Sequence, residues 1–579
     1  MTNDHSPQAW GNPTPAYIPC LRPQSFYDIV ESLSKRTTSE WVLHRIANLL
    51  RKYEQAEEKC SHLTARVEWH PQGLPSFALE DKHLSKVAGT EVTSECMTLT
   101  VFAAEVNDKT LHEVSPDKLL VYCVIKRNRG IGDVSGNVWE AIVRPYLPLN
   151  NYVNGIQKYE REIGGRKFEI NGIYFSQQNG TSAKCAQSAL AMLLRAMGKK
   201  GPHGEEPTPA DVAAMVPKAI GDGLTLNQVV QVLRTYNLEP WAIDFEDPTA
   251  RNVDYRSLVH AGLESGLPVL LSFITRDRTT GKIERHVVTV LGHTLNTDTW
   301  VAEAEFGYGR QSEHKYHPSY DWCTHWIVND DNLGMHYCLQ ANRLTSPWSD
   351  WDVSNKDTRW ARICEWLLRV PRRRWIQGHL KEFHVFGVVV PLPSRGPEDI
   401  KGAEIKTLQL LRNLIAKFKL GKTAPKLLTL SEAQWLSRLE GRLAPKHPGP
   451  GPILRSRLVD RNEYIRHLRE DGDWNHKLID AALIAEVEAA LPEPPKQFWM
   501  TEYTLADLFT ANRRKLGEVL WEPKWADLTD KNDMNGLLAA RVPGMLIMYP
   551  KDGSARKARI TNCWSHVPLL AKATHGNRF

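Results

Sequence analysis

A cysteine stands at the junction between a short loop and a helix with one apolar face, within the segment SQQNGTSAKCAQSALAMLLRAMGKK at 176–200. Loop-forming residues occupy 180–182, and apolar residues then recur with helical spacing from Ala189 to Met197 before the pattern stops at Gly198. A helix with one apolar face needs another layer to pack on. The sequence around it therefore has to supply that layer.

Cys185 is predicted to lie in the first turn of this helix. The positive end of the helix dipole and the free backbone N–H groups at that end favour the thiolate and can donate hydrogen bonds to an oxyanion. Gln177 and Gln178 precede it, and a side-chain amide from either could be a further oxyanion donor. The alternative is a small buried residue that begins a core helix.

The segment LPVLLSFITRDRTTGKIERHVVTVLGHT at 267–294 predicts two strands joined by a polar turn. His286 opens the second strand and alternates with Val287, so it can face a cleft at the strand end while the rest of the strand stays buried. His293 is an odd number of residues away and is expected on the opposite face. We therefore predict His286 as a general base in preference to His293.

A third short strand, in HWIVNDDNLG at 325–334, ends in two carboxylates. A carboxylate here could accept the imidazole N–H of His286 and stabilise its charged form. Asp330 is the preferred residue and Asp331 the alternative. Together with Asn332 they could instead only form a turn, for which these residue types are well suited.

This order of a glutamine, a cysteine at a helix start, a histidine at a strand start and an acid at the end of the next strand resembles the papain-like cysteine peptidases. The resemblance is closest to the bacterial branch that includes bacteriocin-leader-processing peptidases, and it covers about 170–340. The segment GLTLNQVVQVLRTYNLEP is similar to the helix that follows the nucleophile helix in that branch, and SGLPVLLSF with HVVTVLGH is similar to its central strand pair.

The resemblance implies an intracellular peptidase that hydrolyses an amide bond in a protein or peptide substrate without a cofactor. Its site residues would be the nucleophile, the base, the acid and the oxyanion glutamine, here Cys185, His286, Asp330 and Gln178, with Asp331 and Gln177 as alternatives. The family places its glutamine about six residues before the cysteine, whereas Gln178 is seven and Gln177 eight residues before it. The interval from His286 to Asp330 is also longer than usual.

Two other functions fit the same residues. An amine in place of water would make the site a transglutaminase-like acyltransferase, and a chain that keeps the fold without the reaction would be a non-catalytic scaffold or binding protein.

The chain of 579 residues is too long for one hydrophobic core. We predict an α+β fold with a helical start at 26–59 and strands at 96–106 and 118–126 in an N-terminal α+β domain, 1–155. The papain-like domain, a nucleophile helix packed on an antiparallel sheet, would occupy 156–345. A mostly helical C-terminal α+β region, 346–579, would contain a buried strand at 383–392, helices at 461–490 and 504–520, a linker near 445–452 and a closing hairpin at 544–563.

Charge and histidine content suggest two further sites. Residues 401–460 hold 12 Lys/Arg against 4 Asp/Glu, which favours a solvated helix face with an apolar side over a nucleic-acid contact involving Trp435 and Phe418. Four potential zinc ligands occur between 314 and 325, but their spacing matches no familiar zinc motif, so no metal is predicted. They are His314, His317, Cys323 and His325.

No apolar stretch reaches the length of a membrane span, and the N-terminus lacks the pattern of a secretory signal. The nine cysteines are scattered and odd in number, which is typical of reduced thiols. These features predict a cytoplasmic protein without a membrane span.

Overall fold

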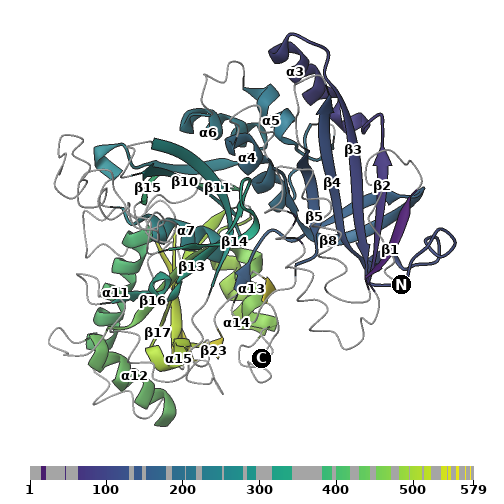
Figure 1. Ribbon diagram of the computed structural model, residues 1–579. Coiled ribbons are helices and arrows are strands. Elements are labelled where there is room, and N and C mark those ends of the chain that lie inside the picture. The colour runs from purple at the N-terminus through teal and green to yellow at the C-terminus, as the bar shows by residue number, and fades with distance from the viewer. Residues whose placement is uncertain are drawn as a thin grey trace, which may run out of the picture.

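A computed structural model of the chain has an α+β fold, with three large, mainly antiparallel sheets and helices packed on and between them (Figure 1). It describes residues 15–20, 43, 46, 63–129, 136–145, 151–177, 185–202, 204–216, 224–250, 253–277, 283–294, 316–341, 381–393, 400–417, 430–443, 451–470, 481–494, 496–510, 514–522, 536–543, 545–549, 556–559, 567–568 and 574–575. Within these residues, no helix combines the length and the apolar character needed to cross a membrane.

The first sheet contains the N-terminal strands, and its described part has the order β1-β2-β3-β4-β5-β8-β7. Their bounds are Ala16–Cys20, Leu63–His70, Thr93–Phe102, Leu119–Arg129, Asn137–Val143, Arg166–Phe175 and Gln157–Ile163. The strands predicted at 96–106 and 118–126 are confirmed as β3 and β4, which pair with each other. The hairpin β7-β8, although it follows residue 155, joins this sheet through β5.

Helix α3 (Ala78–Ala88) packs near the first sheet, and its acidic residues Glu80 and Asp81 pair with the buried Lys126 of β4. Of the helix predicted at 26–59, only Leu43 and Ile46 lie within the described residues, and both are helical and buried.

The second sheet carries the predicted base and the preferred acid, and its strands have the order β14-β13-β11-β10-β15-β9. In chain order these strands are β9 (Glu239–Asp244), β10 (Val269–Asp277), β11 (Ile283–Thr294), β13 (His325–Asp330), β14 (Gly334–Gln340) and β15 (Lys381–Leu392). The predicted pair of strands at 267–294 is confirmed as β10-β11, with Phe273 opposite His286. The predicted strand at 383–392 is confirmed as part of β15, which lies inside this sheet between β10 and β9.

Two helices pack on opposite faces of β11. Helix α4 (Cys185–Ala196) packs beside Val287, and its Ala189 carbonyl accepts a hydrogen bond from the Thr289 hydroxyl at 2.8 Å. Helix α7 (Tyr255–Glu264) shares a core with Val288, whose side chain points to the opposite face of the sheet from that of Val287. The alternation predicted for this strand thus buries it from both sides.

Smaller elements complete the sheet. Strand β6 (Asn151–Val153) pairs with the end of β11, and β24 (Thr574–His575) pairs with β6. Helices α5 (Pro209–Met215) and α6 (Leu226–Thr235) follow α4. The predicted capping box of α6 is confirmed, because Thr225 and Gln228 each accept a hydrogen bond from the backbone of the other.

The third sheet makes the C-terminal region different from the mostly helical one that we expected. Its described strands have the order β12-β16-β17-β19-β20-β21-β22. They span His317–Pro318, Ile453–Asp460, Gln497–Thr504, Gly517–Trp521, Leu537–Val542, Met545–Met548 and Arg556–Arg559. The closing hairpin is confirmed by the pairing of β21 with β22.

The helices of the C-terminal region flank this sheet (Figure 1). They are α11 (Ile400–Lys417), α12 (Leu430–Leu443), α13 (Arg461–Glu470), α14 (Ala481–Ala490) and α15 (Ala506–Thr510). Helices α13 and α14 confirm the helical prediction at 461–470 and 481–490, and the residues between them lie outside the described ones. The prediction at 504–520 is wrong in its second half, where the chain forms β18 (Arg514–Lys515) and most of β19. Most of the predicted linker at 445–452 lies outside the described residues.

Candidate active site

Cys185 is the first residue of α4 and the one residue of that helix that is not fully buried. Every following residue of the helix, to Ala196, is buried between the two sheets. The first N–H groups of a helix have no partner within the helix and carry the positive end of its dipole. The thiol is therefore held by a rigid helix at a position that favours negative charge and remains partly open to solvent.

His286 lies next to this thiol. Its side chain, 16% exposed, is on β11 and lies within hydrogen-bonding reach of the side chain of Cys185. The ring of Phe273, on the paired strand β10, packs edge-on against the imidazole with 5.5 Å between ring centroids. The apolar ring restricts the orientation of the imidazole and shields it from water on that side.

Asp330 and Asp331, at the end of β13, approach the other side of the histidine. His286 Nε2 lies 3.1 Å from Asp330 Oδ2 and 3.7 Å from Asp331 Oδ1. The direction of approach does not give an aligned hydrogen bond at Nε2, so the contact with Asp330 is an ion pair. The structure thus brings together Cys185, His286 and both acidic candidates.

Backbone contacts fix Asp330 in place. Its Oδ1 accepts hydrogen bonds from the backbone amides of Asn332 at 2.9 Å and Leu333 at 3.1 Å. Asp330 therefore forms the predicted turn with one carboxylate oxygen and approaches His286 with the other. The preceding Asn329 donates to the Tyr174 carbonyl on β8 at 3.1 Å. This contact ties β13 to the first sheet.

Mutual contacts shift the pKa values of the pair. Burial acts to lower the pKa of His286, but Asp330, Cys185 and Asp331 raise it to about 10. Burial acts to raise the pKa of Asp330, but His286 and the two backbone amides hold it below its usual value. At neutral pH the site therefore holds an imidazolium beside a carboxylate.

Asp331 has a different environment. Its side chain is 1% exposed, and neither carboxylate oxygen has a hydrogen-bond partner in the described part of the chain. Burial raises the pKa of Asp331 to about 7, with Asp330 adding to the rise and His286 opposing it. The geometry favours Asp330 as the group that orients His286.

Of the two glutamine candidates, the structure describes Gln177. Gln178 lies outside the described residues. Gln177 lies just after β8 of the first sheet, where its side-chain oxygen accepts a hydrogen bond from the Val138 amide at 3.0 Å. That bond fixes the Gln177 side chain on β5.

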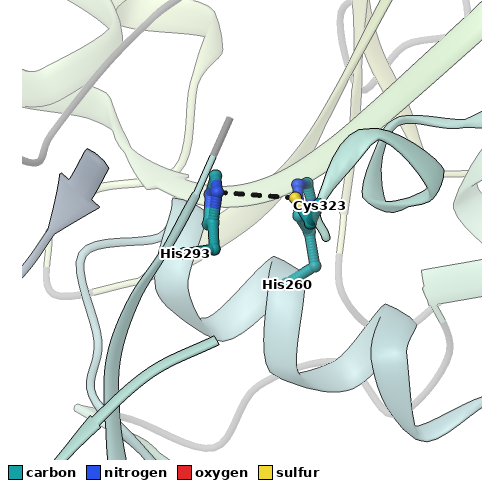
Figure 2. Close-up of side chains that lie close together, drawn as sticks. All are labelled: His260, His293 and Cys323. Atoms are coloured by element: carbon teal, nitrogen blue, oxygen red, sulfur yellow. Dashed lines mark hydrogen bonds between the residues drawn. The ribbon is translucent and has the colours of Figure 1, made fainter. Parts of the chain in front are cut away.

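His293, the second histidine of β11, lies apart from Cys185 in a fully buried group with His260 of α7 and Cys323 (Figure 2). The sequence pattern grouped Cys323 with other histidines as potential metal ligands and gave no place to His260. Of those, His317 packs against Trp322, His325 contacts Thr324, and His314 lies outside the described residues. The spacing of His260 and Glu264, one helical turn apart, was the available signal.

The basic region contains the helix that we expected. In α11, Leu408, Leu411 and Leu414 are buried on one side of the helix. Trp435 of α12 is half-buried, and the guanidinium of Arg438 lies 4.4 Å from its ring centroid. Phe418 lies outside the described residues.

A cavity of about 500 Å³ lies at the other end of α4, lined by residues that include Ala196, Met197 and Lys199. Cys185 and His286 do not line it.

Comparisons with protein-family models, with curated proteins and with solved structures gave no match to this chain. The functional inference is therefore drawn from the geometry of the site and from the order of its residues.

Proposed function

We propose that this chain is a papain-like cysteine peptidase that hydrolyses an amide bond in a protein or peptide. The observation that carries the proposal is the contact of Cys185 with His286 together with the 3.1 Å separation of His286 Nε2 from Asp330. A thiol at a helix N-terminus, a histidine on a neighbouring strand and an acid on the next strand are the parts that thiol acyl transfer requires. The packing of α4 on an antiparallel sheet supports a papain-like core.

The reaction would begin from the thiolate and imidazolium pair. The Cys185 sulfur attacks the substrate carbonyl and forms a C–S bond. The oxyanion accepts a hydrogen bond from the backbone N–H of Cys185 and, by the family resemblance, another from the side-chain amide of Gln178. His286 gives its proton to the amine nitrogen as the C–N bond breaks. The imidazole then takes a proton from water, which attacks the thioester carbonyl, and the C–S bond breaks to release the acid and restore the thiolate.

Asp330 would act through His286. With Nε2 facing the carboxylates, Nδ1 is the nitrogen available to the thiol, and the ion pair with Asp330 stabilises the imidazolium needed for proton transfer. An amine that replaces water in the second step would give acyl transfer in place of hydrolysis. The shape of the acyl-enzyme intermediate is the same in both cases, so the products distinguish them.

The test is the reaction of the full chain with a peptidyl epoxide or with iodoacetamide at low concentration, mapped by mass spectrometry. Cys185 should be alkylated first, and labelling should disappear in Cys185→Ala. Cys338 is exposed on β14 and is the matched control, because Cys338→Ala removes an accessible thiol without touching the site. Profiling of peptide cleavage by the wild type beside Cys185→Ala then identifies the hydrolysed bond.

A Cys185 thiol that reacts no faster than Cys338 would overturn the proposal in favour of the non-catalytic scaffold. Rapid alkylation with a peptide–amine adduct as the main product would establish the acyltransferase instead.

A further inference from the structure

A second buried group, nearer the other end of β11, consists of His260, His293 and Cys323. The side chains have relative exposures of 4%, 0% and 1%, and one ligand atom from each lies within 4.8 Å of the other two. Figure 2 shows the imidazole of His293 facing the sulfur of Cys323, with His260 of α7 beside them. Three side chains of types that can bind a metal converge here from α7, β11 and the turn before β13.

The spacing and the ligand types fit one kind of ion. His293 Nδ1 lies 3.4 Å from Cys323 Sγ. Tetrahedral Zn²⁺, with bonds of about 2.0 Å to nitrogen and about 2.3 Å to sulfur, holds such atoms about 3.5 Å apart. One thiolate with two imidazoles is a set that Zn²⁺ accepts and that hard cations such as Mg²⁺ do not favour.

Glu264 supplies the outer contact that metal-binding histidines usually have. Its Oε1 lies 2.8 Å from His293 Nε2, on the side of the ring opposite Cys323. A carboxylate there fixes the proton on Nε2 and leaves a lone pair on Nδ1, which lies 3.4 Å from Cys323 Sγ and 3.3 Å from the Thr294 carbonyl oxygen. Arg455 of β16 pairs with the other oxygen of Glu264 and is itself held by Glu502 at 2.8 Å.

Stacking fixes the two rings further. The Tyr152 ring lies on one side of His293 with 4.9 Å between centroids, and His260 stacks at 5.3 Å. Rigid side chains that meet without a ligand between them lose conformational entropy, and an ion that all three bind would compensate for it.

We propose that His260, His293 and Cys323 bind one Zn²⁺ ion, with Glu264 as the outer carboxylate and water as the fourth ligand. The ion would join α7, β11 and the segment that leads into β13. Since β11 also carries His286 and β13 carries Asp330, the ion would fix the two strands whose spacing sets the ion pair at the candidate active site. The site does not depend on the peptidase proposal.

The experiment measures metal in untagged full-length protein by mass spectrometry and the spectrum of the Co²⁺-substituted protein. Wild type should hold one equivalent of zinc, and its Co²⁺ form should show sulfur-to-cobalt charge-transfer absorption. Cys323→Ser should lose that absorption and most of the metal, whereas Cys338→Ser should keep both. Glu264→Gln should weaken zinc affinity by about 10–100-fold while keeping the absorption.

The wild type provides a test that does not depend on the folding of any variant. Metal can be removed and returned while thermal melting is followed, and X-ray absorption of the metal-loaded protein should report one sulfur ligand. A wild type without bound metal, and without the cobalt absorption after Co²⁺ is added, overturns the proposal and leaves a hydrogen-bonded cluster. Metal that survives Cys323→Ser but is lost in Asp330→Asn belongs to the group of His286, Asp330 and Asp331, which also overturns it. Cys185→Ala should abolish alkylation and keep the zinc, so the two proposals fail separately.

Discussion

Strand β11 carries two histidines, and each meets a cysteine in a different environment. His286 is 16% exposed, beside a thiol at the open end of α4 and two carboxylates. His293 is fully buried, beside Cys323 and a glutamate that a buried arginine neutralises. The same pair of side chains therefore suits nucleophilic attack at one end of the strand, where a substrate can approach, and metal binding at the other, where it cannot.

The largest expected effect separates the two thiols by reactivity. Cys185→Ala should lower peptide hydrolysis by at least about 10³-fold, because the thiol that forms the thioester beside His286 is gone. Cys323→Ser should leave the rate of alkylation at Cys185 within a few fold, measured on protein shown to be folded by circular dichroism. If Cys323→Ser lost hydrolysis while Cys185→Ala stayed active, the nucleophile would be at the His293 end of β11 and not at the His286 end.

The two acids at the active end should differ next most strongly. Asp330→Asn should lower kcat/KM by about 10–10³-fold, since the imidazolium loses its charged partner at 3.1 Å. Asp331→Asn, at 3.7 Å, should have a much smaller effect on the same measurement. Equal losses, or a larger loss in Asp331→Asn, would move the orienting role to the second carboxylate.

The carboxyl group of Asp331 should instead affect how the free energy of unfolding depends on pH. Its folded-state pKa of about 7 lies above the usual value of 3.8, so the folded state favours the protonated form and loses stability as pH rises through about 7. Asp331→Asn removes this loss and should raise the free energy of unfolding at pH 8 by about 1–3 kcal/mol. Urea denaturation at pH 4 should show little gain, and a gain of the same size at both pH values would contradict the assignment.

The smallest expected effect reports the charge on His286. An imidazolium attracts anionic iodoacetate relative to neutral iodoacetamide, so the ratio of the two alkylation rates at Cys185 should exceed that at Cys338 by about 3–10-fold. The ratio should fall as pH rises through about 10, the pKa of His286. In Asp330→Asn the fall should begin at lower pH, because the carboxylate that raises the pKa is gone.

Local patterns predicted the elements that carry the site. The helix after Cys185, the hairpin that places His286 opposite Phe273, and the strand that ends at Asp330 all follow from short-range periodicity and turn signals. The C-terminal sheet could not be predicted from such patterns, because its strands contain buried charged residues. Arg457 is on β16 and Glu518 on β19, both fully buried, so these strands lack the apolar alternation by which strands are recognised.

Pairing between distant segments was also beyond the sequence patterns. Nothing local in β15 indicates that it lies between β10 and β9, and His260 and His293 meet only because α7 folds back onto β11. Partner choice at this separation depends on the whole fold.

The position of β15 also governs when the candidate enzyme can assemble during synthesis. A nascent chain that has emerged only as far as residue 345 carries every residue of the proposed catalytic group, yet β10 and β9 then have no strand between them. The row of strands from β14 to β9, which supports His286, gains its last strand only after residue 392 has left the ribosome. If the chain is the peptidase proposed above, its activity would begin only after part of the C-terminal half has been translated.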